Sequence, residues 1–356
     1  MTIAVLCNYE LQPNRIGGMD YFFWRFDSAV KNLGHQIEWF FPNHELHGDY
    51  PNMIIFAAER NSIENMFIEV IASKKKHYDI IFCHFLELCT PFYKKLKSQL
   101  PLSRVIVIDH NPRPFEGYPF KKKLLKRIKG LMFSKYIDQF VGVSEYTVAE
   151  ISKDFGRHLN SKTEIIYNGI LTEKIRIKRE RNHHNPRFLT ACHLRRSKGI
   201  QDLIEAVYLL PKEIQRNLVI DIYGDGEYKD DLQKLIIKLG LEFNFIFKGN
   251  SPNLGGVFYN YDYLIQPTHM ECFSLSILEG LAANVPVITT PVGGNLEVVT
   301  NNYNGFVFNA GDCTALKSIL ENIILGKMKI TQNTSIQIQE GFTLAKMVEN
   351  YLKLIH

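Results

Sequence analysis

Residues 269–279 read HMECFSLSILE, a polar turn that leads into an apolar segment with helical spacing. The strand-like run Tyr263–Gln266 comes just before it, and Ser274 is a favourable N-cap residue for a helix. We therefore expect Glu271 in a loop at the carboxyl end of a strand, and Glu279 on the helix that follows.

This turn has the chemistry of an anion and sugar site. Backbone N–H groups at the start of a helix have no partner within the helix, so they can bind a diphosphate or a sugar hydroxyl. The residues expected to bind a donor in this way are Cys272, Phe273, Ser274 and Leu275. Carboxylates such as Glu271 and Glu279 accept hydrogen bonds from vicinal hydroxyls. Taken alone, the two glutamates fit a purely structural reading equally well. In that reading Glu271 interacts with the helix dipole, and Glu279 is a solvated helix residue.

Outside this stretch, short apolar runs alternate with helical patterns, which is typical of α/β units with parallel sheets. The strands expected in the first half are Ile3–Cys7, Ile37–Phe41, Ile80–His84, Arg104–Asp109 and Gln139–Val143. Those expected in the second half are Phe188–Cys192, Leu218–Tyr223, Phe243–Phe247, Tyr263–Gln266, Val285–Thr289 and Gly305–Phe308. The charged segment 172–187 separates the halves, so we predict two doubly wound domains.

The composition is that of a packed soluble enzyme, with 46% hydrophobic and 22% charged residues among 356. The six cysteines are far apart and form no C-x-x-C pair, which favours a reducing, cytoplasmic compartment without disulfides or a metal site. The net charge of +5 comes with no nucleic-acid-binding motif, so no nucleic-acid partner is expected. The N-terminus is expected to form a first strand and not a signal peptide.

Further motifs lie around the two glutamates, which are separated by seven residues. Residues 280–299 read GLAANVPVITTPVGGNLEVV, and residues 302–308 read NYNGFVF. Together they resemble the retaining glycosyltransferases of family four. The resemblance implies the GT-B fold, in which two Rossmann-like domains face each other across a cleft. In that family the first glutamate contacts the donor sugar and the second contacts the ribose, which assigns these roles to Glu271 and Glu279.

Residues 188–199 read FLTACHLRRSKG and resemble the family element that carries two cations. Lys198 matches the lysine that neutralises the leaving diphosphate. His193 stands where the family has arginine, so we assign the second cation to Arg195 and keep His193 as a further donor-binding group. The alternative for Arg195 is a solvated surface charge.

Three more positions match family landmarks. Gly224 belongs to a Gly-x-Gly turn, which is equally well an ordinary tight turn. Gly17 and Gly18 match the family's phosphate loop after the first strand. His110 follows a buried strand and matches the histidine beside the reacting sugar. A lone histidine is usually structural, but this place at a strand end favours function.

The resemblance also implies that the two domains bind different substrates. Residues 1–168 would form the acceptor domain, completed by a last helix over 342–356 that crosses back, and residues 169–341 would bind the nucleotide sugar. We expect a UDP-sugar donor, with GDP-mannose as the alternative, and a glycan or lipid-linked acceptor of cell-surface polysaccharide or glycoconjugate synthesis. No D-x-D pair is present, so we expect neither a metal nor a cofactor. A nucleotide-sugar epimerase of the same fold and a non-catalytic membrane-binding relative stay open as alternatives.

Residues 120–133 read FKKKLLKRIKGLMF, with apolar residues at helical spacing and lysines around them. This pattern is typical of an interfacial helix on anionic lipid. It favours a peripheral position on the inner face of the membrane. The alternative is a helix that packs into the core with a basic solvated face.

Overall fold

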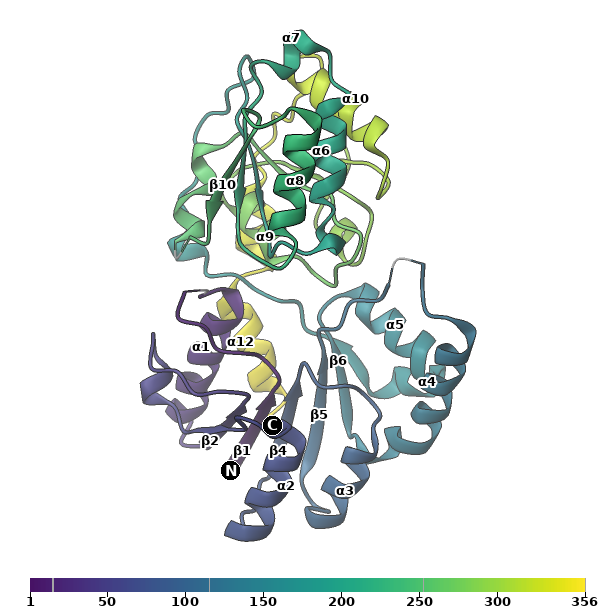
Figure 1. The fold of residues 1–356 in the computed structure, drawn as a ribbon. Coiled ribbons are helices and arrows are strands. Elements are labelled where there is room, and N and C mark those ends of the chain that lie inside the picture. The colour runs from purple at the N-terminus through teal and green to yellow at the C-terminus, as the bar shows by residue number, and fades with distance from the viewer. Residues whose placement is uncertain (15, 115, 252, 356) are drawn as a thin grey trace. The chain divides into compact units, whose positions relative to one another are not determined.

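The computed structural model describes residues 1–14, 16–114, 116–251 and 253–355. The chain forms two compact units (Figure 1). Unit 1 consists of Met1–Asn168 together with Leu344–His356, and unit 2 consists of Gly169–Thr343. Each unit is an α/β domain built on one parallel sheet and is described by itself.

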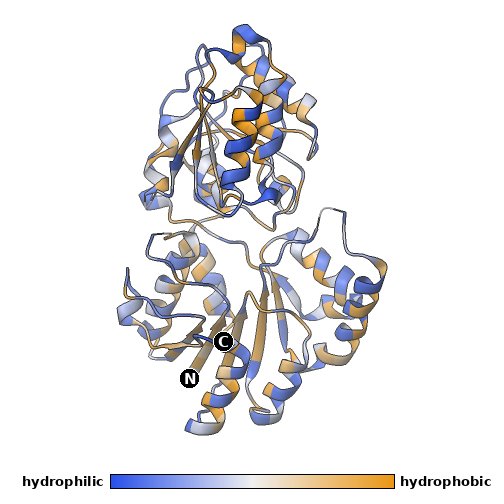
Figure 2. Ribbon diagram, viewed as in Figure 1, coloured by the Kyte–Doolittle hydropathy of each residue, from blue (hydrophilic) through white to orange (hydrophobic). Residues whose placement is uncertain are grey.

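Unit 1 contains a seven-stranded sheet in the order β3-β2-β1-β4-β5-β6-β7, in which every pairing is parallel. The strands are β1 Thr2–Cys7, β2 Gln36–Phe41, β3 Ile55–Ala57, β4 Ile80–His84, β5 Arg104–Asp109, β6 Gln139–Gly142 and β7 Thr163–Ile165. Successive residues of β5 are buried on both faces, because helices cover both sides of the sheet. Figure 2 shows the strands of this sheet in hydrophobic colours.

The helices of unit 1 connect consecutive strands, as parallel pairing requires. They are α1 Gly18–Asn32, α2 Ile63–Lys74, α3 Pro91–Gln99, α4 Phe120–Phe133 and α5 Glu145–Phe155. The order of the strands reverses direction between β1 and β4. In sheets of this type the ligand crevice lies at that point, outside the carboxyl ends of the strands.

Unit 2 repeats the architecture with six parallel strands in the order β10-β9-β8-β11-β12-β13. The strands are β8 Phe188–Ala191, β9 Ile220–Tyr223, β10 Phe245–Gly249, β11 Tyr263–Gln266, β12 Val287–Thr289 and β13 Gly305–Val307. The helices are α6 Ile200–Tyr208, α7 Lys212–Gln215, α8 Lys229–Leu239, α9 Leu275–Ala282, α10 Cys313–Ile324 and α11 Ser335–Gly341. The strand order reverses between β8 and β11.

The last helix, α12 Leu344–Lys353, belongs to unit 1 although it follows unit 2 in the sequence. It begins at Leu344 and not at Phe342 as expected, because Phe342 caps the preceding helix α11. Tyr351 is buried against α1, with its ring 4.7 Å from that of Phe22 and 5.8 Å from that of Phe26. Aromatic packing therefore joins the two ends of the chain within one hydrophobic core.

Candidate active site

The predicted residues of unit 2 lie at the point where the strand order reverses. The loop after β8 carries Lys198, and the loop after β11 carries Glu271. Because β8 and β11 are parallel neighbours, their carboxyl ends meet at the same edge of the sheet.

Lys198 and Glu271 form an ion pair, with 2.7 Å between Nζ and Oε2. Burial alone would lower the pKa of the Lys198 ammonium, but the charge and hydrogen bond of Glu271, together with Cys192 and Cys272, raise it overall. The other Glu271 oxygen accepts the backbone N–H of Cys272 at 3.1 Å. A cation and a carboxylate from two different loops are thus held together at the sheet edge.

Glu279 lies on α9 and is half-buried. Burial raises the pKa of its carboxyl to about 7. Among the residues that the structure describes, no hydrogen bond or ion pair is found for this side chain, in contrast to Glu271. A half-buried carboxylate without a partner is costly, and hydrogen-bond donors from a ligand would relieve that cost.

Helix α9 begins at Leu275, and Ser274 is its N-cap as predicted, its hydroxyl accepting from the N–H of Ile277 at 3.5 Å. The turn before the helix lies against Gly293, whose φ is +62°. A Cβ atom at Gly293 would lie 2.2 Å from the carbonyl oxygen of Glu271, so only glycine fits there. The neighbouring Gly294 donates its N–H to the carbonyl of Cys272 at 2.8 Å. These contacts fix the turn that contains Cys272 and Phe273.

The remaining predicted cations surround Glu227. The Nε2 atom of His193 lies 3.3 Å and the Nε atom of Arg195 lies 3.5 Å from its two carboxylate oxygens. The Arg195 side chain is 59% exposed, whereas that of Lys198 is 20% exposed. Arg195 is therefore far more exposed than the half-buried Lys198–Glu271 pair. Gly224, which follows β9, donates its N–H to the carbonyl of Gly249 at 2.8 Å.

In unit 1, Gly17 and Gly18 mark the start of α1, as the predicted phosphate loop requires. The N–H of Gly17, however, donates to the Asp20 carboxylate at 2.9 Å. Tyr9 and Tyr50 donate their hydroxyls to the same carboxylate, at 3.0 and 2.7 Å. The Gly17 amide is thus already hydrogen-bonded to a carboxylate, which counts against a phosphate at that atom.

His110 lies directly after β5, also at the edge where ligands bind in such sheets. Its Nε2 atom is 3.1 Å from Nδ1 of His84, the last residue of β4. Burial lowers the pKa of His110 to about 3. Burial, and to a lesser extent His110, lower the pKa of His84 well below its usual value. Both rings are therefore neutral at physiological pH.

Comparison with known proteins agrees with this arrangement. The family model described as "Glycosyltransferase Family 4" matches residues 16–174, and the model "Glycosyl transferases group 1" matches residues 172–338. The two matches together cover residues 16–338, which include every strand of both sheets except β1. The chain belongs to glycosyltransferase family 4.

Two curated relatives and one solved structure illustrate the family. The uncharacterized glycosyltransferase MJ1607 of Methanocaldococcus jannaschii is 30% identical over 47% of this chain and 46% of its own length. The putative glycosyltransferase EpsD of Bacillus subtilis is 25% identical over 77% of this chain and 76% of its own. Anabaena HepE, solved with UDP and glucose, has a TM-score of 0.78 at 16% identity, covering 99% of this chain and 98% of that one. The fold of this glycosyltransferase is thus GT-B.

Sequence reasoning missed the residues that hold the functional loops of this glycosyltransferase. His269 forms a short hydrogen bond with Asp202 at the start of α6, and its N–H donates to the carbonyl of Ser197 at 2.8 Å. These contacts tie the Glu271 loop to the Lys198 loop. His84 was also missed, although its place at the end of a strand next to that of His110 was a usable signal.

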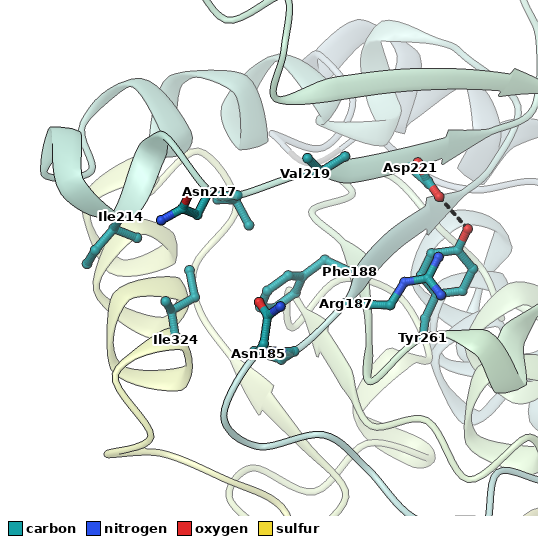
Figure 3. A pocket seen from close by; sticks show the side chains of 11 residues that line it. Asn185, Arg187, Phe188, Ile214, Asn217, Val219, Asp221, Tyr261 and Ile324 are labelled. Carbon is teal, nitrogen blue, oxygen red and sulfur yellow. Dashed lines mark hydrogen bonds between the residues drawn. The ribbon is translucent and has the colours of Figure 1, made fainter.

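A cavity of about 320 Å³ lies elsewhere in unit 2, near the amino ends of β8 and β9 (Figure 3). Apolar side chains such as Phe188 and Val219 line it, together with Arg187 and Asp221. The hydroxyl of Tyr261 donates to Asp221 at 2.5 Å within it. None of the predicted site residues lines this cavity, and ligands of parallel sheets bind at the opposite strand ends, so we assign no role to it.

Proposed function

We propose that this glycosyltransferase transfers a sugar from a UDP-sugar to an acceptor hydroxyl with retention of anomeric configuration. The observation that carries the proposal is the Glu279 carboxylate, which has no partner among the described residues and lies on α9, the helix that follows the Glu271 loop. Two neighbouring ribose hydroxyls are the donors that would satisfy such a carboxylate. HepE, with UDP and glucose, supports a uridine nucleotide as the donor, and GDP-mannose is the alternative.

In the proposed mechanism the donor replaces the internal ion pair. Lys198 turns from Glu271 to the diphosphate and stabilises the negative charge that develops as the sugar departs. Glu271 then accepts hydrogen bonds from the sugar. The acceptor hydroxyl attacks on the side of the leaving group, and its proton passes to a diphosphate oxygen. Catalysis by positioning and charge stabilisation requires no enzymic base.

A direct test combines binding and product analysis. We expect UDP, in a screen with GDP, ADP and CMP, to raise the melting temperature, and Glu279→Ala to abolish that shift. NMR of the product anomer should give the configuration of the donor. Transfer should persist in EDTA, because a lysine and a helix N-terminus supply the positive charge. An inverted anomer would refute retention, and an epimerised donor formed without acceptor would favour the epimerase.

The proposal extends to the acceptor through helix α4. Six of its seven large apolar side chains are exposed, from 43% at Ile128 to 80% at Phe120. The other four exposed ones are Leu124, Leu125, Leu131 and Met132. The seventh, Phe133, is half-buried and packs against the core. The exposure of the other six counts against the alternative of a helix that buries its apolar side in the core. Figure 2 shows both hydrophobic and hydrophilic colours along this helix.

The side of α4 that faces the protein carries Lys126, Lys129 and Gly130. Lys126 pairs with the buried Asp154 at 2.8 Å, and Lys129 pairs with Glu87 at 2.7 Å. Gly130 is buried so closely against α5 that a Cβ atom there would lie 2.0 Å from the carbonyl oxygen of Phe155. The apolar side of α4 thus points away from the helix that it packs on.

We propose that this apolar side enters the interface of an anionic membrane and that the acceptor is lipid-linked. Lys121, Lys122, Lys123 and Arg127 are exposed and can contact lipid phosphates. Within the described part of the chain, no helix is both long enough and apolar enough to cross a bilayer.

A further inference from the structure

The pair His84–His110 holds the predicted sugar-side histidine in one orientation. The rings are stacked, with centroids 5.3 Å apart and planes 26° apart. The ring centroids of Phe85 and His110 are 4.1 Å apart, and those of Tyr351 in α12 and His84 are 5.7 Å apart. Each imidazole therefore contacts the other imidazole and at least one further aromatic ring.

Each imidazole carries one ring proton, because burial keeps both rings neutral. The hydrogen bond of 3.1 Å joins Nδ1 of His84 to Nε2 of His110, so one of these two atoms bears the proton and the other accepts it. The hydrogen-bond network around the pair decides which tautomer each ring adopts.

The second nitrogen of His84 provides that information. Its Nε2 atom is buried and has no hydrogen-bond partner among the described residues. A buried N–H without an acceptor is rarer and less favourable than an acceptor without a donor. The proton of His84 therefore lies on Nδ1 and is donated to Nε2 of His110. His110 must then carry its own proton on Nδ1.

We infer that His84 is a positioning residue that fixes His110 as the Nδ1–H tautomer. His110 consequently carries a hydrogen-bond donor at Nδ1 and cannot serve as a general base through that atom. The sugar as ligand rests on the function proposed above, whereas the tautomer rests on unit 1 alone. A donor at this position agrees with a mechanism in which the diphosphate takes the acceptor proton.

The tautomer can be read by long-range ¹H–¹⁵N correlation spectra of the full chain labelled with ¹⁵N-histidine. The His110 signals are assigned with His110→Gln. We expect the wild-type spectrum to place the His110 proton on Nδ1. His84→Asn keeps an N–H donor near the Nδ1 position and should retain that pattern. His84→Phe keeps the stacked ring but removes the donor, and should populate the Nε2–H form of His110.

Tyr351→Phe is the matched control, because it alters a ring that contacts His84 without touching the hydrogen bond, and it should leave the His110 pattern unchanged. Melting curves verify that each variant is folded. A wild-type proton on Nε2, or an unchanged His110 pattern in folded His84→Phe, would overturn the inference.

Turnover supplies a second reading. kcat should fall by about tenfold in His84→Phe, the loss of one hydrogen bond, with KM little changed, and His84→Asn should recover most of it. If the spectra agree and no transfer is observed with any donor, the proposed function fails while the tautomer assignment stands.

Discussion

Lys198 is the residue whose charge the proposed mechanism uses most directly. Lys198→Ala should lower kcat on the order of 100-fold, because one charge-stabilising group is lost at a developing anion. Arg195→Ala should cost less, since Arg195 is largely exposed and close to Glu227, and Arg196→Ala is the matched control on the same loop. Steady-state kinetics with a soluble acceptor measure all three. Equal rates in the three variants would mean that the diphosphate lies elsewhere.

The raised pKa of Glu279 predicts that the affinity for UDP increases with pH. Its pKa is raised to about 7 by burial, and a ribose diol binds the ionised form, so UDP affinity should rise between pH 6 and pH 8. Calorimetry measures this. Glu279→Gln should bind UDP weakly and keep only the pH dependence of UDP itself.

The pH dependence of protein stability gives an independent test of the raised pKa of Glu279. The folded pKa of about 7 lies above the value of about 4.3 for an unfolded glutamate, so the folded state binds more protons. The contribution of Glu279 to stability is therefore lost as pH rises from about 4 to 7. Glu279→Gln should raise the melting temperature at pH 8 and leave it nearly unchanged at pH 5. No gain at pH 8 would contradict the raised pKa.

At the residue scale, the sequence predicted which side chains share an edge of the sheet but not their partners. The motif spacing identified Glu271 and Lys198, which the fold joins at 2.7 Å. That Glu279 has no partner among the described residues depends on every neighbouring side chain, and a sequence motif does not contain this information. The bond between Gly17 and Asp20 likewise depends on how α1 begins.

At the scale of elements, substitutions on the exposed side of α4 should change membrane binding without changing stability. Leu124→Ser with Ile128→Ser should abolish sedimentation with anionic vesicles and leave the melting temperature unchanged, because both side chains are exposed. Lys121, Lys122 and Lys123 changed together to Gln should weaken binding by about 1 kcal/mol for each charge, most strongly at low salt.

Lys126→Gln is the contrasting variant in the same helix. Its ammonium pairs with the buried Asp154, so this substitution should lower the melting temperature. Wild-type protein that does not sediment with anionic vesicles at low salt would refute the membrane proposal. A lower melting temperature in the double serine variant would mean that α4 is covered by protein.

The two strands that were missed from the sequence are β3 Ile55–Ala57 and β7 Thr163–Ile165. Length alone does not explain this, because β12 and β13 are equally short and were identified. β3 was missed although it lies in the apolar run 53–58, whereas β7 has too few residues to show a period. Both lie at the outer edges of the seven-stranded sheet. The orientation of α4 could not be predicted either, because an amphipathic pattern does not tell which side meets the protein.

At the scale of the whole molecule, the two units should unfold in separate transitions that respond to different changes. Tyr351→Ala should cost about 3–5 kcal/mol of unit 1 stability, because a fully buried aromatic ring of α12 is removed from the core. Calorimetry should show the unit 1 transition moving down, whereas UDP raises only the unit 2 transition. Tyr263→Ala in β11 is the matched control, with the opposite pattern. One joint transition in every case would refute independent units.

The return of α12 to unit 1 also has a consequence for synthesis on the ribosome. Domains usually fold in the order in which they emerge, beginning with the N-terminal one. Here the N-terminal unit lacks Leu344–His356 until after Gly169–Thr343 has been synthesised. The nascent chain therefore contains the whole of its second unit before its first is complete, and the α1 surface that receives Tyr351 stays uncovered until α12 has left the ribosome.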